Sequence, residues 1–433
     1  MGMHELYDKF PDVAPAIITK TELVRVGETF SKAAIEAFNE PNDILFKGFW
    51  LFSYDRGEPV LYGEKIPAFI RLQDGSRVQQ RTYKNSPYLI DYIDGKFMLC
   101  DESGPLEEVG FEIRPRYFNR LLPDGTPMGA IVQCTRDLLF ITLNKYCEMF
   151  RNGNQCLYCD FNAQTKAQKK GGEALVVRKD PEVVADVLEI AFSELRFRHI
   201  FITGGTILST YKGKSEIEYY CEHLNTIRKR LKVWYPAHFQ CGAQTEDNWK
   251  RIHDTGVGAV EPNMEVWDKR LFEIICPGKA KFIGYDEWIK RTIKAVDFFG
   301  PENVVPNFVT GVEMAKPMGF ETVSSALKST LGGWDFLMSH GVIPRMDMWC
   351  IEPGSKLAEH NLEPPPLEYY IEVEKGYLEL REKHGFMTLP SLFDSRAMCY
   401  HNCMTDWEYY HGSGPRSLKS LNKKREDEEG NLL

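Results

Sequence analysis

Three cysteines lie close together in one segment of the chain, at Cys147, Cys156 and Cys159. An aromatic residue, Tyr158, directly precedes the third. Residues 137–144, just upstream, are mostly apolar, which predicts a buried strand. The cysteines therefore follow the carboxyl end of a strand, where open α/β sheets and barrels place their chemistry. Thiolates are soft ligands that suit zinc or iron–sulfur clusters, and three of them leave one metal coordination position for a ligand that is not protein.

A structural zinc site is one alternative for these cysteines, and buried free thiols are another. Structural zinc requires four protein ligands, and Cys134 is the candidate for the fourth. It precedes the predicted strand, so it should lie at the end of that strand opposite to Cys147. Because a strand rises about 3.3 Å per residue, we expect the two thiols to be too far apart to share a tetrahedral ion.

Composition restricts the partners and the compartment. The chain has 433 residues, of which 43% are hydrophobic and 27% charged, as in an ordinary globular protein. Its net charge is −9 and it has no long basic run, so we expect neither nucleic acid nor an anionic membrane as a partner. The amino terminus lacks the pattern of a signal peptide. Eleven cysteines favour reduced thiols or metal ligands over a disulfide framework, and we expect a cytoplasmic protein.

The pattern of residues predicts a mixed α/β chain in three parts. Residues 1–130 carry short β-like runs separated by Asp-Gly turns, which predicts a β-rich accessory domain. Residues 131–355 alternate strands with amphipathic helices, which predicts a partial (β/α)6 TIM-like barrel. Residues 356–433 form a carboxy-terminal extension with a disordered tail. The six predicted barrel strands cover residues 137–144, 199–203, 237–242, 259–265, 304–311 and 342–351.

The cysteine segment, C-x8-C-x2-C with an aromatic residue before the last cysteine, resembles that of the radical S-adenosylmethionine (radical SAM) superfamily. The usual spacing there is C-x3-C-x2-C, so the second gap matches and the first is five residues longer. The resemblance covers residues 135–358. It implies a [4Fe–4S] cluster held by Cys147, Cys156 and Cys159, with the amino acid end of S-adenosylmethionine (SAM) on the fourth iron.

Two downstream segments add to the resemblance. Gly204, Gly205 and Thr206 follow the second predicted strand, where the superfamily has a Gly-Gly-Glu type motif whose backbone receives the SAM ammonium group. Glycine permits such a close approach, although an isolated Gly-Gly pair is usually a turn. Residues 246–311 resemble the corresponding stretch of biotin synthase and of the related hydrogenase maturase, and residues 346–354 match a strand and loop that usually lie near adenine.

This second resemblance implies further SAM contacts. Glu265 is the candidate for binding the SAM ribose or amino group, with Asn263 as its neighbour on the same face of the strand. The alternative role for Glu265 is that of an acid at a helix amino terminus. Lys281 and Arg291 are both candidates for holding the SAM carboxylate, and the sequence does not choose between them.

Other polar groups have weaker assignments. Four residues near strand ends are candidates for substrate contact or, equally, satisfied polar groups of the core: Gln240, Gln244, Arg345 and Asp347. An auxiliary cluster is a further hypothesis, although buried thiols are the commoner outcome for so few cysteines. Its candidate ligands are Cys399, Cys403, His401, His411 and Cys350.

The resemblance implies an enzyme that reductively cleaves SAM at the cluster to form a 5′-deoxyadenosyl radical, which abstracts hydrogen from a substrate. The branch indicates a small molecule or cofactor precursor, and a flavodoxin or ferredoxin-type protein as electron donor. One alternative is modification of a peptide or protein recognised by residues 1–130. Another is a non-catalytic zinc or iron–sulfur protein. No spacing outside the cofactor set identifies a catalytic residue or the substrate.

Overall fold

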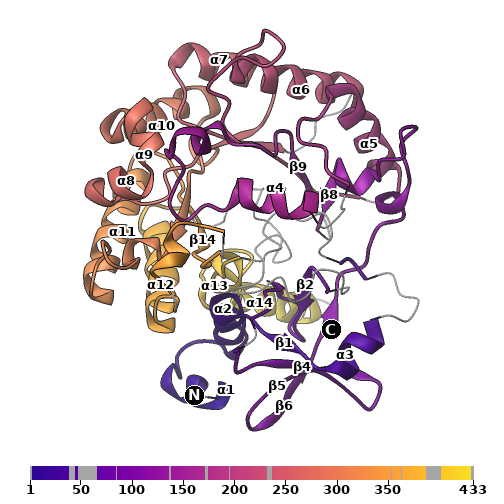
Figure 1. The fold of residues 1–433 in the computed structure, drawn as a ribbon. Helices are drawn as coiled ribbons and strands as arrows, with labels where there is room; N and C mark the ends of the chain where they lie inside the picture. Colours follow the sequence, from indigo (N-terminus) through magenta and orange to yellow (C-terminus); the bar gives the residue numbers. More distant parts are fainter. Residues whose placement is uncertain are drawn as a thin grey trace.

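Parallel strands covered by helices form the centre of the molecule, with a β-rich amino-terminal part and a carboxy-terminal group of helices beside them (Figure 1). Among the described residues, no helix is long and apolar enough to cross a membrane. The computed structural model describes residues 2–38, 44–46, 66–83, 85–135, 138–170, 174–194, 196–231, 237–352, 354–361, 363–386 and 401–430.

The central strands follow one another in space in the order of the chain. Four of them form one parallel sheet: β9 (Leu138–Thr142), β10 (His199–Thr203), β11 (Ala237–Cys241) and β12 (Ala259–Pro262). Two more, β13 (Asn307–Thr310) and β14 (Arg345–Met348), pair with each other in parallel. Single parallel bridges, Val260 with Val304 and Glu265 with Phe308, connect the two sheets. All six predicted strands are thus observed in order, and in the described part of the chain they do not close into a continuous barrel.

The two faces of this sheet differ in polarity. On one face the Phe239 ring of β11 packs against Tyr220 of α6 (Glu216–Leu231), with ring centroids 5.0 Å apart. The other face carries rings that pack on each other, as Phe140 does on Phe201 at 4.7 Å. Because side chains alternate along a strand, the helix-covered face is apolar and the opposite, inner face collects the polar residues. The helices on the covered side are α5 (Pro181–Glu194), α6, α7 (Glu246–Asp254), α8 (Lys269–Ile275), α9 (Pro277–Phe282), α10 (Tyr285–Phe299) and α11 (Val323–Met338).

The amino-terminal part contains helices as well as the predicted strands: α1 (Met3–Lys9), α2 (Pro15–Val26) and α3 (Lys32–Phe38). One sheet has the order β1 (Thr29–Phe30), β4 (Leu89–Ile93), β5 (Lys96–Asp101) and β6 (Gly104–Glu108), and a second has β3 (Arg77–Gln79), β2 (Phe69–Arg71) and β7 (Gly110–Phe111). α2 begins with a proline, whose fixed φ suits the first helical turn, and it is buried against α12 (Leu367–Lys383).

The carboxy-terminal residues complete the packing around β14. Met348 N donates to His401 O at 3.0 Å, and Asn402 Nδ2 donates to Met346 O at 2.7 Å, so this segment covers the free edge of β14. α13 (Met404–His411) follows and meets α2 through an ion pair between Lys20 and Asp406 at 2.6 Å.

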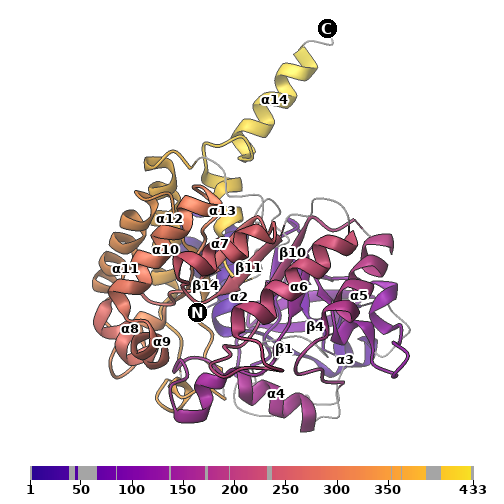
Figure 2. The ribbon, with the colours of Figure 1, turned by 90° about the horizontal axis from the view of Figure 1, so that it is seen from above.

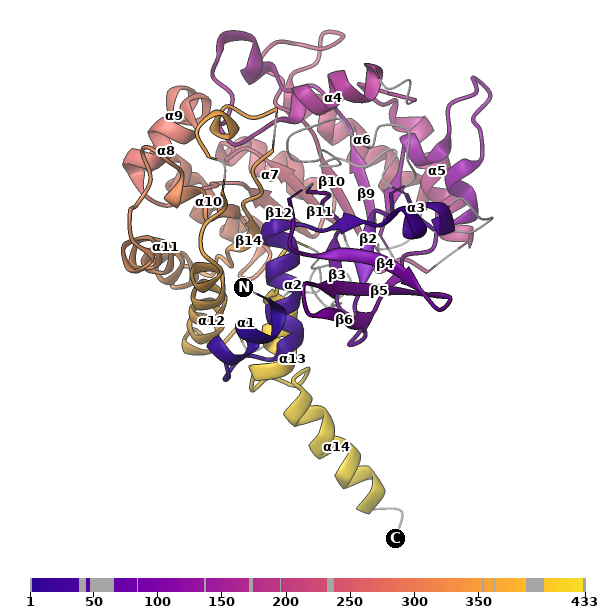
Figure 3. The ribbon, with the colours of Figure 1, turned by 60° about the horizontal axis from the view of Figure 1, so that its bottom comes forward.

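Most of the segment predicted to be a disordered tail is helical in this structure. It forms α14 (Leu418–Gly430), which projects away from the body of the protein (Figures 2 and 3). The segment lacks an apolar stripe, so it has no face with which to pack. Lysine, arginine, glutamate and leucine are nevertheless strong helix formers, and their local preference supports a helix that meets the rest of the protein mainly at α13.

Candidate active site

The cysteine segment forms an ordered loop after β9. The long first gap is occupied by a 3₁₀ helix, η4 (Glu148–Asn152), which directly follows Cys147. Asn162, in the first turn of α4 (Phe161–Lys170), holds the Cys147 backbone from outside: its Oδ1 accepts from Cys147 N at 2.9 Å and its Nδ2 donates to Cys147 O at 3.0 Å. The additional residues of the first gap are therefore a folded turn, and the unusual spacing does not disorder the loop.

The three thiols are free and influence one another. Burial raises the pKa of Cys147 and, more strongly, that of Cys159, and the nearby Cys156 thiol raises both further. Within the described ranges, no three histidine, cysteine or carboxylate side chains converge where a single ion could bind. A cubane differs from a single ion because each cysteine binds a different iron. The donor set, three free thiols in one loop, fits an iron–sulfur cluster.

The Gly204–Gly205 bend lies against this loop. Gly205 N donates to Asn144 O at 2.8 Å, and Asn144 Nδ2 donates to both Gly205 O and Tyr146 O, at 2.8 and 2.7 Å. A Cβ atom at Gly205 would lie 2.6 Å from the Tyr146 carbonyl carbon and 2.7 Å from Cys147 N. Only glycine therefore fits where the bend meets the peptide that precedes the first cysteine.

A buried carboxylate that the sequence did not single out joins the same two segments. Glu148, directly after Cys147, donates its backbone N–H to Thr206 O at 2.8 Å. Its side chain accepts from the backbone of Leu208 and Ser209 at 2.8 and 2.7 Å. Although burial raises the pKa of Glu148, these hydrogen bonds bring it below its usual value. The loop after β10 is thus fastened to the cysteine loop through one side chain.

Glu265 occupies a strained position beyond β12. Its φ is +75°, a conformation that non-glycine residues rarely adopt and that is concentrated at functional sites. The residue is only 5% exposed. Lys279 Nζ lies 2.6 Å from Glu265 Oε1 and 2.6 Å from Asn263 O, while the Asn263 side chain turns to Asn307 N at 3.1 Å. Glu265 is therefore paired with a lysine that the sequence analysis did not consider.

The two cations predicted for the SAM carboxylate lie elsewhere. Lys281 is exposed, with its Nζ 5.6 Å from the Phe282 ring centroid. Arg291 pairs with Glu287 on its own helix at 2.9 Å. For Lys281 the reason is helical geometry. Positions two apart do not share a face of a helix, so α9 turns Lys279 inward and Lys281 to solvent.

A fourth cysteine also reaches the loop. The turn between α8 and α9 is joined to it by backbone hydrogen bonds, from Leu157 N to Ile275 O at 2.8 Å and from Gly278 N to Asn154 O at 3.1 Å. Cys276, in this turn, is buried and its thiol lies against Cys156, whose pKa is lowered first by that contact and then by Lys279 despite burial. Tyr158 is half-buried beside these groups, and burial raises its pKa well above the usual value.

Five ionisable side chains run across the inner face of the strands: His199, His238, Glu261, Arg345 and Asp347. The two histidine rings stack with centroids 4.6 Å apart and are hydrogen-bonded to each other. His238 Nε2 is 3.1 Å from Glu261 Oε1, and Arg345 lies 3.7 Å from Glu261 and 3.0 Å from Asp347. Glu261 is fully buried, which raises its pKa to about 7 against the opposing effect of Arg345. Neither of its oxygens has a hydrogen bond of good geometry among the described residues.

The structure therefore brings together two of the four predicted substrate residues, Arg345 and Asp347. Gln240 lies on the same face and accepts a hydrogen bond from Thr203 Oγ1. Gln244 does not face this network; it lies in the loop before α7 and bonds to Gly242 O at 3.1 Å. The histidines and Glu261 were missed, although polar residues at alternate positions of apolar strands are a visible signal.

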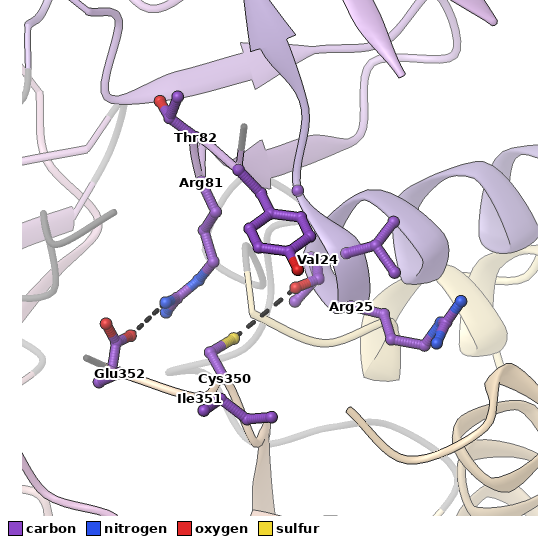
Figure 4. Close-up of a pocket in the computed structure, with 10 residues that line it drawn as sticks. Val24, Arg25, Arg81, Thr82, Cys350, Ile351 and Glu352 are labelled. Carbon is purple, nitrogen blue, oxygen red and sulfur yellow. Dashed lines mark hydrogen bonds and ion pairs between the residues drawn. The ribbon is translucent and has the colours of Figure 1, made fainter. Parts of the chain in front are cut away.

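A pocket lies where the amino-terminal part meets the loop after β14 (Figure 4). Its lining comes from residues 24–27, 81–83 and 350–352. Arg81 points to Glu352 and pairs with it, and Cys350 Sγ donates to Val24 O at 3.7 Å. Asp160, next to Cys159, is buried beside this pair; burial, followed by Glu352, raises its pKa well above the usual value. The amino-terminal part thus supplies a cation, Arg81, close to Asp160 at the end of the cysteine loop.

The candidates for an auxiliary cluster do not meet in the described part of the chain. Cys403 Sγ bonds to Thr21 Oγ1 at 3.3 Å, and Cys350 turns to Val24 as described above. His411 accepts from Ala14 N at 3.2 Å. His401 is buried beside β14, and Cys399 lies outside the described residues.

One curated relative matches most of the chain. Bacteriochlorophyllide c C-7(1)-hydroxylase of Chlorobaculum limnaeum is 22% identical over 381 residues, which cover 85% of this chain and 86% of that protein. The chain thus has both this sequence similarity and a three-cysteine loop that the glycine bend contacts. These findings support the radical SAM superfamily for this chain.

Solved structures resemble this chain more distantly. Methylornithine synthase has 16% identity and a TM-score of 0.40, covering 66% of this chain and 80% of its own. Active domain 2 of a Pyrococcus furiosus chitinase has 10% identity and a TM-score of 0.31, covering 57% and 86%. Both scores are too low to support a statement about the site. No family model matches the chain.

Proposed function

We propose that this radical SAM enzyme holds a [4Fe–4S] cluster through Cys147, Cys156 and Cys159. When bound, the cluster and SAM together supply the reductive cleavage that yields a 5′-deoxyadenosyl radical for hydrogen abstraction. The observation that carries the proposal is the contact between the Gly205 bend and the Cys147 peptide. It brings the glycine bend, whose backbone is the proposed SAM contact, against the loop that carries the proposed cluster ligands.

We further propose that SAM is bound by the backbone of the glycine bend, by Thr206 and Tyr158, and by Glu265 with Lys279. Burial opposes the charge on Lys279, but Glu265 and then Cys156 raise its pKa, so it remains a cation close to both. An ammonium in that position suits a carboxylate ligand. We therefore assign to Lys279 the role that the sequence suggested for Lys281 or Arg291.

The strands β9–β14 would act as a partial (β/α)6 barrel whose inner face holds the substrate. Gln240, Arg345 and Asp347 are the predicted contacts, and the unsatisfied Glu261 carboxylate adds an acceptor for a substrate N–H or O–H group. Such a face favours a ligand with polar groups. The name of the hydroxylase relative supports a cofactor-type small molecule, and a chlorin is the first substrate class to test.

Anaerobic reconstitution with iron and sulfide tests the proposal. We expect visible absorption of a cluster, and 5′-deoxyadenosine when SAM and dithionite are added. Cys156→Ala should abolish both while the circular dichroism spectrum is unchanged. Cys221→Ala is the matched control, because Cys221 lies on α6 and bonds to Arg251 O at 3.8 Å. A reconstituted protein that contains the cluster and forms no 5′-deoxyadenosine would contradict the proposed function.

A further inference from the structure

The surface of α4, the helix that follows the cysteine loop, is basic, although the chain as a whole has a net charge of −9. α4 contains three lysines and no acidic residue. Lys166, Lys169 and Lys170 are all exposed. None of the three has an ion-pair partner in the part of the chain that the structure describes. Their charges are therefore free to act on an approaching molecule.

Buried residues of α4 hold the cluster loop. Asn162 binds the Cys147 backbone through the two hydrogen bonds given above. Thr165 Oγ1 donates to Lys145 O at 2.8 Å, and Gln168 accepts from Lys145 Nζ at 3.4 Å. Because an α-helix rises 1.5 Å per residue, Lys170 is about 12 Å along the axis from Asn162. All three lysines thus lie on the outside of the element that positions a cluster ligand.

Two further cations border the same loop. Arg151 lies in η4 and is exposed, as is Lys356, whose Nζ is 3.9 Å from the Cβ position of Gly153. The acids of this region are mostly withdrawn from the surface: Glu148 and Asp160 are 2% and 1% exposed. One exposed acid, Glu359, follows in η6 (Leu357–Glu359). Among the described residues around the loop, exposed cations therefore outnumber exposed acids.

We propose that this basic surface, formed by α4, Arg151 and Lys356, is the docking site of an acidic electron-donor protein. The inference rests on the proposed function, because the cluster must receive one electron from a donor, which is oxidised by one electron in the same step. Opposite charges would guide the donor to α4, the helix that is hydrogen-bonded to the Cys147 backbone. Electrostatic guidance of this kind raises association rates by about 10- to 1,000-fold and weakens with salt.

Charge reversal on α4 tests the proposal, with a reduced acidic flavodoxin as the probe. The variant K166E/K169E/K170E is compared with K419E/K423E/K424E, which makes the same change of charge on α14. α14 projects from the side of the molecule away from α4 (Figures 2 and 3). The readout is the rate at which flavodoxin bleaches the cluster absorption, at about 50 and 500 mM salt, where the Debye length falls from above 10 Å to below 8 Å.

We expect the α4 variant to be reduced at least 10-fold more slowly at low salt, with little salt dependence, and the α14 variant to behave as wild type. Reduction by dithionite, and the 5′-deoxyadenosine that it produces, should be unchanged in both, which shows that the cluster is intact. Calorimetric binding of oxidised flavodoxin to the cluster-free protein gives a second readout. An unchanged rate and affinity in the α4 variant, or an equal loss in the α14 variant, would overturn the docking site. Failure of dithionite to yield 5′-deoxyadenosine in wild type would instead contradict the proposed function.

Discussion

Gly205→Ala is the most direct probe of the contact on which the site depends. The new methyl group would meet the Tyr146 carbonyl carbon and oxygen at 2.6 Å and Cys147 N at 2.7 Å. Ordinary van der Waals contact begins near 3.4 Å, so the peptide before the first cysteine must move by about 0.8 Å. The obstructing atoms belong to the backbone, which cannot relax by changing rotamer. Overpacking of this kind costs about 1–3 kcal/mol.

We expect two measurable effects of this substitution. The free energy of unfolding, measured by denaturant titration of the cluster-free protein, should fall by about 1–3 kcal/mol. After reconstitution, 5′-deoxyadenosine formation should fall by about 10- to 100-fold, because a misplacement of roughly 1 Å has effects of that size on catalysis.

A matched glycine provides the control. Gly332 lies in α11, and nothing would lie within 4 Å of a Cβ atom there. Gly332→Ala should be neutral or stabilise the protein by about 0.5–1 kcal/mol, since alanine is the better helix former. If Gly205→Ala were as stable and as active as Gly332→Ala, the close contact of bend and loop would be refuted.

Two further predictions concern buried charges. Lys279→Met should destabilise the protein by about 3–5 kcal/mol, because it leaves Glu265 buried without its cation, and should weaken SAM binding measured by calorimetry; Lys281→Met should do neither, and equal effects would contradict the pairing. Burial raises the pKa of Glu261 to about 7 from about 4.3 in an unfolded chain. Because the folded state holds this proton more tightly, the contribution of Glu261 to stability is lost as pH rises from about 4 to 7. The unfolding free energy of Glu261→Gln should therefore rise relative to that of wild type as pH increases across that range, by up to about 4 kcal/mol. Parallel curves of stability against pH for the two proteins would exclude the raised pKa of Glu261.

The sequence predicted those features that depend on local pattern. Runs such as Leu138–Thr142 are apolar enough to indicate a buried strand by themselves, and the position of each strand end follows from the turn residues after it. The cysteine loop and Gly204–Gly205 are both placed at strand ends, and parallel strand ends share one edge of a sheet. Their proximity therefore follows from the order of strands and helices along the chain.

Features that depend on the packing of distant segments could not be predicted in this way. Lys279 and Lys281 are equivalent by type, and only the orientation of α9 decides which meets Glu265. The positive φ of Glu265 depends on its pairing with β13, and Arg81 comes from a part of the chain with no chemical signature. Helix α14 was missed for a different reason: hydrophobic periodicity reports packing, and this helix packs against little.

The buried pair of Lys20 and Asp406 has a consequence for any attempt to divide this protein. The two side chains are 0% and 2% exposed and stand at 2.6 Å, although nearly four hundred residues separate them. A shortened chain that begins at the barrel would lose α2 and this pair with it, and even Lys20→Met in the full chain would leave a buried anion without its partner, at a cost of about 3–5 kcal/mol. That loss is comparable to the whole net stability of many folded domains, about 5–15 kcal/mol. This pair connects the amino-terminal helix α2 to the carboxy-terminal helix α13, and removing either helix should destabilise the packing of strands β9–β14.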